Sequence, residues 1–407
     1  MGTEATVKRM FDGYRVLELG TWVLVPAAAT VLADFGADVI KIEHPRRGDP
    51  QRGLSTGGVT PTVDGVSIAI EQTNRGKRSV GLDLAVAEGR EVLYELAARS
   101  DVFITSFLPA ARRKLQIDVE HLRARNPDII YVRADATGPE GPDGGKPGYD
   151  SAVFFGRGGI LDSLDPDGVR LPPTLPGFGD KTGAMNVAFG VAAALLRRER
   201  TGEPSVVDVS LLGSALWVNS SSIVYSAAIG ADFTRRQRRH TNPIAGTYRT
   251  ADGRWICLTM LESDRWWPDL CRHLGRDDLL ADPRFADAQA RTDNSPACVD
   301  ELARTFASAP LDEWRRRLAT LRAPWEVVQN QLEALDDPQA RENGYVAEVD
   351  HPTGRRVTVV RAPVQFDETP APLGTAPEPG AHTEEVLLEI GHDWHDIARY
   401  QELGAIA

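Results

Sequence analysis

Residues 14–43 read YRVLELGTWVLVPAAATVLADFGADVIKIE, and this stretch decides the fold. The apolar runs at residues 14–19 and 39–43 each have the length of a buried strand. Between them, residues 26–35 repeat small and branched apolar side chains at helical spacing, and Gly36 closes the pattern. Strand, helix and strand in this order are the unit of a parallel sheet with a right-handed crossover.

The same alternation continues to about residue 135. Further strands are predicted at residues 80–84, 101–106, 129–132 and 206–209. We therefore predict an α/β fold whose large domain is doubly wound and Rossmann-like. A dinucleotide site is not favoured, because the turn after the first strand holds only Gly20 where the dinucleotide fingerprint has three glycines.

The pattern changes after about residue 220. The basic run at residues 235–240 (RRQRRH) predicts a linker, and Ala251-Asp252-Gly253 predicts a hairpin between two strands. Helical patterns follow at residues 266–274, 299–306 and 311–321. The later chain predicts a helix at 335–344, strands at 346–349 and 355–360, and a last helix at 383–391. The hairpin and the three helical patterns between residues 247 and 321 indicate a second, smaller α+β unit.

The composition of the chain indicates which partners and which compartment are favoured. The 407 residues include 46 Lys and Arg against 58 Asp and Glu, and the net charge of −12 disfavours nucleic acid or an anionic membrane as a partner. The three cysteines show no CxxC spacing, so neither a structural zinc site nor a disulfide framework is predicted. No apolar run is long enough to span a bilayer. We expect a cytoplasmic protein without a metal.

One carboxylate stands out in residues 175–184, LPGFGDKTGA. Asp180 occupies the expected N-cap position of a helix whose apolar repeats run to Leu195. Spacing alone favours a plain cap. The alternative is a nucleophile, because a carboxylate at the positive end of a helix dipole stays ionised.

Glycine-rich and basic segments surround this position in the sequence. Residues 137–150 form a long Gly- and Pro-rich loop. Gly156 to Gly159 either form a turn or supply N–H donors to an oxyanion, and Gly177 to Gly179 are the other candidate donors. Basic clusters at residues 46–52, 75–78 and 112–114 recur near predicted strand ends. Such clusters suit a ligand with several phosphates.

Taken together, the motifs resemble those of the class III CoA-transferases, the formyl-CoA transferase and carnitine CoA-transferase group, which share a fold with the α-methylacyl-CoA racemases. The matching segments are VLELG at 16–20, LADFGADVIKIEHP at 32–45, NRGKRSVGLDL at 74–84, KPGYD at 146–150, GD at 179–180, RRERTGEPSVVDVSLL at 197–212, DGRW at 252–255 and PGAHTEEVLLEIG at 379–391. Their order and spacing cover nearly the whole chain.

The resemblance implies a reaction and a site. It makes Asp180 the nucleophile, which forms first a mixed anhydride with the acyl group of an acyl-CoA donor and then an aspartyl-CoA thioester, before CoA passes to a carboxylic acid acceptor. It implies no tightly bound cofactor, with CoA entering only as part of the substrate. The residues it assigns are Asp180, Tyr149 and Asp150 for catalysis, and His44, Arg46, Arg78, Leu82, Phe107 and Lys114 for CoA binding.

The resemblance also implies the organisation of the chain. Residues 1–220 and 330–407 are expected to form the large CoA-binding domain, completed by the C-terminal segment, and residues 221–329 the linker and small domain. Relatives form interlocked homodimers, so a second copy of the chain is the expected partner.

Departures from the family pattern bear on specificity. Val23 and Val25 stand in the first loop where relatives carry a polar residue and glycine, and Leu54 replaces a tryptophan of the oxalate-handling members. We expect Val25 to narrow the space near the thioester, and an acceptor with more apolar surface than oxalate.

Two other functions stay open. A racemase of this fold uses a histidine where Tyr149 stands, with a glutamate near Glu262, and tyrosine is a poor base at neutral pH. A CoA-binding paralogue without catalysis is the second alternative.

Overall fold

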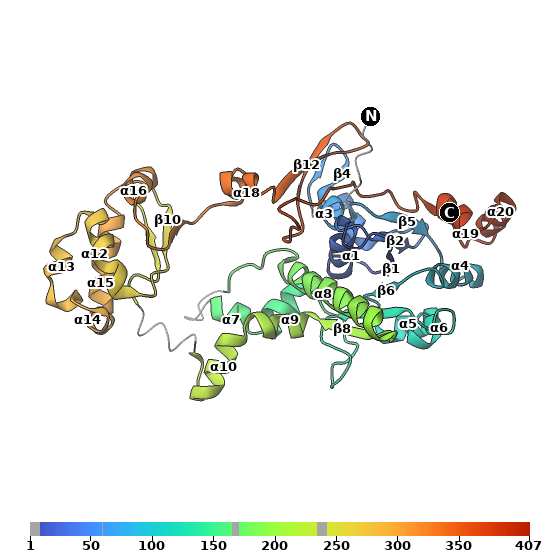
Figure 1. Cartoon of the computed structure of the whole chain (residues 1–407), viewed down its shortest axis with the longest axis horizontal. Helices are drawn as coiled ribbons and strands as arrows, with labels where there is room; N and C mark the ends of the chain where they lie inside the picture. Colours follow the sequence, from blue (N-terminus) through green and yellow to red (C-terminus); the bar gives the residue numbers. More distant parts are fainter. Residues whose placement is uncertain (1–8, 59, 165–170, 234–241) are drawn as a thin grey trace. The chain divides into compact units, whose positions relative to one another are not determined.

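The computed structural model describes residues 9–58, 60–164, 171–233 and 242–407. The chain forms two compact units, one of Met1–Ser221 with Pro338–Ala407 and the other of Ser222–Asp337 (Figure 1). The basic run at residues 235–240, predicted as a linker, lies outside the described residues.

A six-stranded parallel sheet is the centre of the first unit. Its order is β5-β2-β1-β6-β7-β8, and every neighbouring pair is parallel. The strands are β1 (Arg15–Leu19), β2 (Asp38–Glu43), β5 (Arg78–Gly81), β6 (Val102–Thr105), β7 (Ile130–Asp135) and β8 (Val206–Ser210). The order reverses between β1 and β6, and such a switch point is where doubly wound sheets bind ligands.

Alternate strand residues enter two separate cores, one on each face of the sheet. Val16, Val39 and Val102 pack with α1 (Leu24–Asp34) and α8 (Phe178–Thr201). Leu17 and Ile40, their immediate neighbours, pack on the other face with α4 (Ala87–Ala97), α19 (Thr383–Ile390) and α20 (Trp394–Glu402). The C-terminal helices therefore complete the core of the first unit, and α20 is one helix more than the sequence predicted.

Shorter elements fill the first unit. The helices are α2 (Pro50–Thr56), α3 (Ile68–Asn74), α5 (Pro109–Leu115), α6 (Val119–Arg123), the π-helix η1 (Ser151–Arg157), α7 (Ile160–Leu164), α9 (Leu211–Val218) and α18 (Pro338–Glu342). Two small antiparallel pairs join β3 (Thr62–Val63) to β4 (Val66–Ser67) and β12 (Val346–Asp350) to β13 (Arg356–Val360). Helix α10 (Ser220–Ile229) continues the chain past the boundary between the units.

The second unit combines helices with a small antiparallel sheet. Its antiparallel sheet joins β9 (Thr247–Arg249), β10 (Trp255–Leu258) and β11 (Trp325–Val327), with β10 in the middle. The turn between β9 and β10 places Gly253 at a φ of 78°, which explains the Asp-Gly pair there. The helices are α12 (Ser263–Leu274), α13 (Asp278–Ala281), the 3₁₀ helix η2 (Pro283–Phe285), α14 (Ala288–Asp293), α15 (Ser295–Phe306), α16 (Leu311–Leu318) and α17 (Gln331–Leu335).

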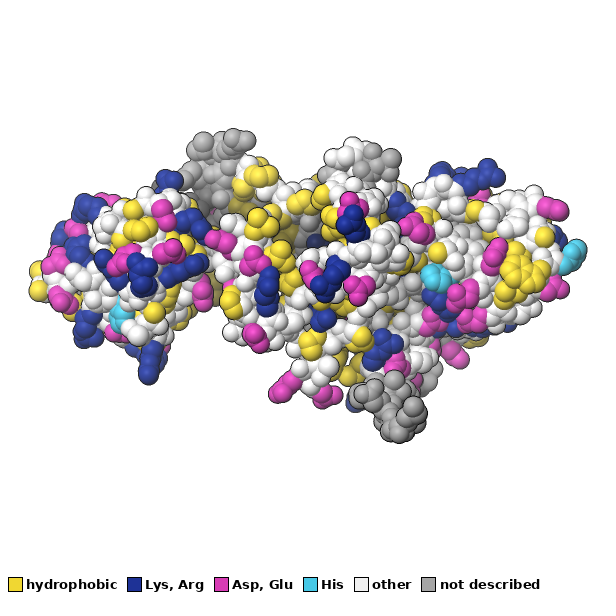
Figure 2. Space-filling view, turned by 90° about the horizontal axis from the view of Figure 1, so that it is seen from above, with side chains coloured by type: hydrophobic (Ala, Val, Ile, Leu, Met, Phe, Trp, Pro, Cys, Tyr) yellow, Lys and Arg dark blue, Asp and Glu magenta, His cyan; other side chains and the backbone are white. Residues whose placement is uncertain are grey.

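Charge is mixed on the visible surface. Figure 2 shows basic and acidic side chains interspersed across the face in view. Within the residues placed by the structure, no helix is both long and apolar enough to cross a membrane.

Candidate active site

A pocket of about 190 Å³ opens at the carboxyl ends of the strands on both sides of the switch point. Three of its walls come from the segments directly after β1, β6 and β7, and Asp180 contributes a carboxylate from α8. The lining residues are Thr21, Trp22, Leu24, Ser106, Leu108, Ala134, Asp135, Ala136, Pro147, Gly148, Tyr149, Asp180 and Leu211. The pocket has the size of an acyl group and not of a whole CoA molecule.

Asp180 is not the N-cap of its helix, so that prediction was wrong. The cap is Gly177, whose φ of 67° is a left-handed conformation that glycine adopts without strain. The helix therefore begins at Phe178, and Asp180 lies in its first turn. The N–H groups of a first helical turn lack intrahelical acceptors, so those of Gly179 and Asp180 are donors close to the carboxylate.

Two glycines, one beside Asp180 and one in the first loop, allow close packing around the site. A Cβ at Gly179 would come within 2.4 Å of the Phe154 ring, so only glycine lets α8 approach η1 this closely. At the first loop, Val25 is fully buried, and a Cβ at Gly20 would meet it at 2.3 Å. Val25 packs in the core and is absent from the pocket lining, which corrects the expectation that it narrows the space near the thioester.

The electrostatics of Asp180 are unusual for a carboxyl group. Burial, and then the nearby carboxylate of Asp150, raise the pKa of Asp180 to about 7. Asp150 is itself buried; its Oδ1 accepts a hydrogen bond from Ser151 Oγ at 3.3 Å, and its Oδ2 has no hydrogen-bond partner. Asp180 is therefore partly protonated near neutral pH, which corrects the expectation that the helix dipole keeps it ionised.

Tyr149 lies at the mouth of the pocket. Its side chain is 59% exposed, and its ring meets that of Trp22 edge-on at 5.7 Å between centroids. The structure therefore brings Tyr149, Asp150 and Asp180 together, although they lie up to thirty-one positions apart in the chain.

The glycines at 156–159 do not supply free donors, which corrects one of the two interpretations given to them. The N–H of Gly158 donates to the carbonyl of Val153, and that of Gly159 donates to the carbonyl of Gly156. These residues end the π-helix η1 instead. The backbone N–H groups of Gly179 and Asp180 are therefore the candidate oxyanion donors.

Five of the six predicted CoA-binding residues lie in segments that follow the carboxyl ends of neighbouring strands. His44 and Arg46 follow β2, Leu82 follows β5, and Phe107 follows β6, with Lys114 exposed on α5. The side chain of His44 is held in place, because its Nδ1 accepts hydrogen bonds from the backbone N–H groups of Arg46 and Arg47 at 3.2 and 3.3 Å.

Arg78 lies apart from this group. It begins β5, and its guanidinium pairs with Asp38, the first residue of β2, at 2.6 Å and with Glu389 of α19. These partners place the guanidinium at the amino edge of the sheet, opposite the pocket. The ion pairs join β5 to β2 and α19, so Arg78 has a structural role.

Each of the basic clusters, which we interpreted as phosphate contacts, contains an arginine that pairs with a carboxylate of the fold. Arg75 pairs with Asp34 at 2.7 Å, and both side chains are buried. Arg52 pairs with Glu43, and Arg112 with Asp118 at 2.7 Å. Clustering in the sequence did not reveal which carboxylates lie opposite these three arginines in the fold. For the exposed side chains of Arg46, Arg47, Arg113 and Lys114 the phosphate interpretation stays a prediction.

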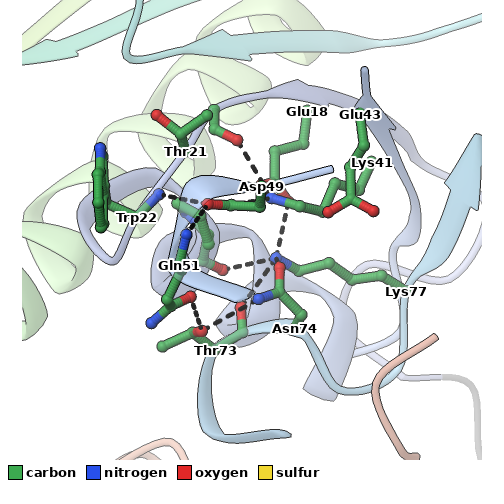
Figure 3. Close-up of polar contacts among 12 residues, drawn as sticks. Glu18, Thr21, Trp22, Lys41, Glu43, Asp49, Gln51, Thr73, Asn74 and Lys77 are labelled. Atoms are coloured by element: carbon green, nitrogen blue, oxygen red, sulfur yellow. Dashed lines mark hydrogen bonds and ion pairs between the residues drawn. The ribbon is translucent and has the colours of Figure 1, made fainter. Parts of the chain in front are cut away.

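Sequence reasoning missed a group of buried charges below the first loop. Glu18, Lys41, Asp49 and Lys77, which we call the buried ionic cluster, are each less than 5% exposed (Figure 3). Burial lowers the pKa of Lys77 to about 8, whereas for Lys41 the carboxylates of Glu18 and Asp49 outweigh burial and raise the pKa. The signal was present, since Glu18 and Lys41 are charged residues inside otherwise apolar strands.

Comparisons with known proteins identify the family. The family model described as CoA-transferase family III matches residues 11–383. The chain belongs to CoA-transferase family III. It is 30% identical to an (R)-2-hydroxy-4-methylpentanoate CoA-transferase of Clostridioides difficile over 97% of this chain and 98% of that one. It is also 30% identical to a cinnamoyl-CoA:phenyllactate CoA-transferase of Clostridium sporogenes, over 97% and 96%.

Solved structures agree with this family III assignment. A CaiB/BaiF family protein from Brucella suis superposes with a TM-score of 0.81 at 29% identity, covering 94% of this chain and 100% of that one. The predicted family and the predicted mixed α/β fold with a central parallel sheet are thus confirmed, and the chain is a CoA-transferase. Among the described residues, no group of histidine, cysteine and carboxylate side chains is arranged to hold a metal ion.

Proposed function

We propose that this family III enzyme moves CoA from an acyl-CoA donor to a carboxylic acid through covalent intermediates on Asp180. The observation that carries the proposal is the position of Asp180: a half-buried carboxylate in the first turn of α8, facing a pocket of acyl size at the switch point of the sheet.

The reaction divides into four displacements that need no net proton transfer. A carboxylate oxygen of Asp180 attacks the donor thioester carbonyl, the C–S bond breaks, and CoA thiolate leaves a mixed anhydride behind. The thiolate then attacks the Asp180 carbonyl of the anhydride, releasing the donor acid and forming an aspartyl-CoA thioester. The acceptor carboxylate attacks the Asp180 carbonyl of this thioester, the C–S bond breaks, and CoA thiolate leaves a second mixed anhydride. The thiolate finally attacks the acceptor carbonyl of this anhydride, so the acceptor departs as its CoA ester and the Asp180 carboxylate is regenerated.

The surrounding groups have roles that follow from their places. The first-turn N–H groups of α8 are donors for the oxyanions of the anhydride steps. Burial, and then the charge of Asp150, keep part of the Asp180 population protonated near neutral pH. The same burial leaves the ionised carboxylate less strongly solvated and therefore more reactive when it forms. The residues proposed to bind CoA are His44, Arg46, Leu82, Phe107 and Lys114, whereas Arg78 is taken up by its ion pairs with Asp38 and Glu389.

The substrates we propose are apolar acids and their CoA esters. Leu24, Leu108 and Leu211 line the pocket with Trp22, and two relatives carry names that specify a branched or an aromatic 2-hydroxy acid. An oxalate-like acceptor does not fit walls of this kind, because it would leave its second carboxylate without a partner.

The wider assignments from the sequence remain proposals. We expect residues 1–220 with 330–407 to be the CoA-binding domain, the active enzyme to be an interlocked homodimer, and its compartment to be the cytoplasm. Sedimentation equilibrium at micromolar concentration tests the dimer, and a monomer that retains full activity would contradict it.

Trapping of the intermediates tests the mechanism. The protein is mixed with acyl-CoA, treated with hydroxylamine or borohydride, and digested for mass spectrometry. We expect the modification on the peptide containing Asp180 and its absence in Asp180→Asn. A broad acyl panel that leaves no adduct on the wild-type protein would favour the CoA-binding paralogue.

The racemase alternative predicts a different result. In deuterated buffer with a chiral 2-methylacyl-CoA and no acceptor acid, a racemase exchanges the α-proton, and a transferase does not. Tyr149 stands at the position of the racemase histidine, and the other residue of that comparison, Glu262, pairs with Arg265 at 2.7 Å in the second unit. Exchange of the α-proton would overturn the transferase mechanism.

A further inference from the structure

The buried ionic cluster has no part in the proposed chemistry, although two of its members bond to the turn after β1 that lines the pocket. Lys41 Nζ is 2.9 Å from Glu18 and 3.0 Å from Asp49, and Lys77 Nζ is 2.7 Å from Glu18. Two anions and two cations balance, and each ammonium also donates to backbone carbonyls. Buried charges are costly unless they are fully paired, so a cluster of this kind calls for a function of its own.

Asp49 connects the cluster to the pocket wall. Its Oδ2 accepts from Lys41, and its Oδ1 accepts from the backbone N–H of Trp22 at 3.1 Å and of Gln51 at 2.9 Å (Figure 3). Lys41 donates in addition to the carbonyl of Gly20 at 3.1 Å. One buried carboxylate and one buried ammonium therefore fix both ends of the turn after β1.

The turn after β1 contains a residue in a strained backbone conformation. Trp22 has a φ of 67°, a left-handed conformation that bulky residues rarely adopt and that persists only when surrounding contacts impose it. Thr21 supplies a third contact, because its N–H donates to Ser106 Oγ at 3.1 Å.

The strained conformation directs the indole to the site. Trp22 lines the same pocket as Asp180, and its ring packs edge-on against Tyr149 at an interplanar angle of 89°. Together with Leu108 it makes an apolar wall beside the nucleophile.

We propose that Trp22 is a specificity-determining residue that selects acyl groups with a flat or branched apolar body, and that Asp49 is the positioning residue that holds Trp22 in place. The inference rests on the proposed function, since it concerns the acyl group bound beside Asp180. It adds the residue that chooses the substrate and the buried group that sets its position.

The test compares 3-phenylpropionyl-CoA and acetyl-CoA as donors, with the best acceptor from a screen of carboxylic acids. We measure the ratio of kcat/KM for the two donors. Trp22→Gly keeps the left-handed φ without strain and removes the ring, so it should lower the ratio about tenfold. Trp22→Phe retains an aromatic wall and should keep most of the selectivity.

Asp49→Asn tests the positioning role. The amide oxygen still accepts from Trp22 N–H, but the charge that anchors it to Lys41 is gone. We expect the ratio to fall about three- to tenfold, and we expect this effect to vanish in the Trp22→Gly background, because residues that act through one another are not additive. A loss of stability alone would lower kcat/KM for both donors equally. Trp394→Ala, which removes an exposed tryptophan on α20, is the matched control and should leave the ratio unchanged.

Several results would overturn the inference. One is a ratio in Trp22→Gly within twofold of the wild type, and another is an Asp49→Asn effect of equal size in both backgrounds. If Asp49→Asn does not fold, Asp49→Glu keeps the charge beside Lys41 but moves the carboxylate by one methylene group, and an unchanged ratio there would refute the positioning role of Asp49. A wild-type protein that transfers no CoA and forms no Asp180 adduct refutes the proposed function instead, so the two failures are distinguishable.

Discussion

Removing the charge of Asp150 should change the pH dependence of the enzyme in a direction that the structure dictates. The pKa of Asp180 is raised from 3.8 to about 7, first by burial and second by Asp150. Only the ionised carboxylate attacks, so kcat/KM of the wild type should rise about tenfold per pH unit below 7 and level off above it.

The size of the change follows from the order of these causes. The full shift of roughly three pH units corresponds to about 4 kcal/mol, and burial supplies the larger part. Asp150→Asn should therefore lower the midpoint of the kcat/KM profile by at most about 1.5 pH units. With a midpoint near 6, half of Asp180 is ionised at pH 6, compared with about a tenth in the wild type, and the share of ionised nucleophile rises about fivefold.

The assay is kcat/KM for one acyl-CoA donor between pH 5 and 9, with both proteins measured against the same donor so that ionisation of CoA itself is common to them. The normalised profile, and not the absolute rate, carries the prediction, because Asp150→Asn also alters the pocket. A midpoint that stays in place or moves upward would refute the assignment of Asp150 as a charge acting on Asp180.

The raised pKa of Asp180 can also be tested through the stability of the protein, without any activity measurement. Because the folded-state pKa of Asp180 lies above its unfolded value, its ionisation destabilises the fold as pH rises from about 4 to 7. Asp180→Asn removes this penalty, so it should raise the free energy of unfolding at pH 8 by up to about 4 kcal/mol and change it little at pH 4. Urea unfolding at the two pH values measures the difference, and equal effects at both would contradict the raised pKa.

Three further substitutions test the packing around the site. Gly179→Ala places a Cβ against the Phe154 ring, so it should lower stability by about 1–3 kcal/mol and reduce transfer, as measured by thermal unfolding and kcat. Gly177→Ala puts alanine at a φ of 67° and should cost about 1 kcal/mol; an unchanged melting temperature would argue against Gly177 as the cap. Lys41→Met leaves two buried carboxylates without their shared cation and should cost about 3–5 kcal/mol in urea unfolding, whereas a neutral result would mean that the cluster is not buried in solution.

Much of the fold could be predicted from local patterns. Apolar runs of strand length alternated with helical repeats, and those patterns appear as β1, α1, β2 and their successors in a parallel sheet. The predictions that failed were of two kinds. Those for Val25 and for the paired arginines depended on contacts between distant segments, and the start of α8 depended on one backbone conformation. Helix α8 begins before Asp180 because Gly177 adopts a positive φ, which the sequence around it allowed but did not require.

Candidate site residues divide in the same way. Asp180 could be singled out from its place before a helix and from the family motifs, and Tyr149 and Asp150 from the motif KPGYD. The role of Trp22 could not be predicted, since nothing local distinguishes a tryptophan that lines a pocket from one that packs in the core. Its position depends on Asp49, which lies twenty-seven residues further along the chain.

The sequence by itself determined the order of strands and helices, the family, and the choice of Asp180 as the candidate nucleophile. Each of these depends on residue types and their spacing along the chain. The tertiary structure alone decided which charges meet. It paired Arg75 with Asp34, enclosed Lys41 and Lys77 among carboxylates, and brought Asp150 close enough to Asp180 to raise its pKa. The physical reason is that burial and Coulomb interaction depend on distance in space, which spacing along a chain does not give.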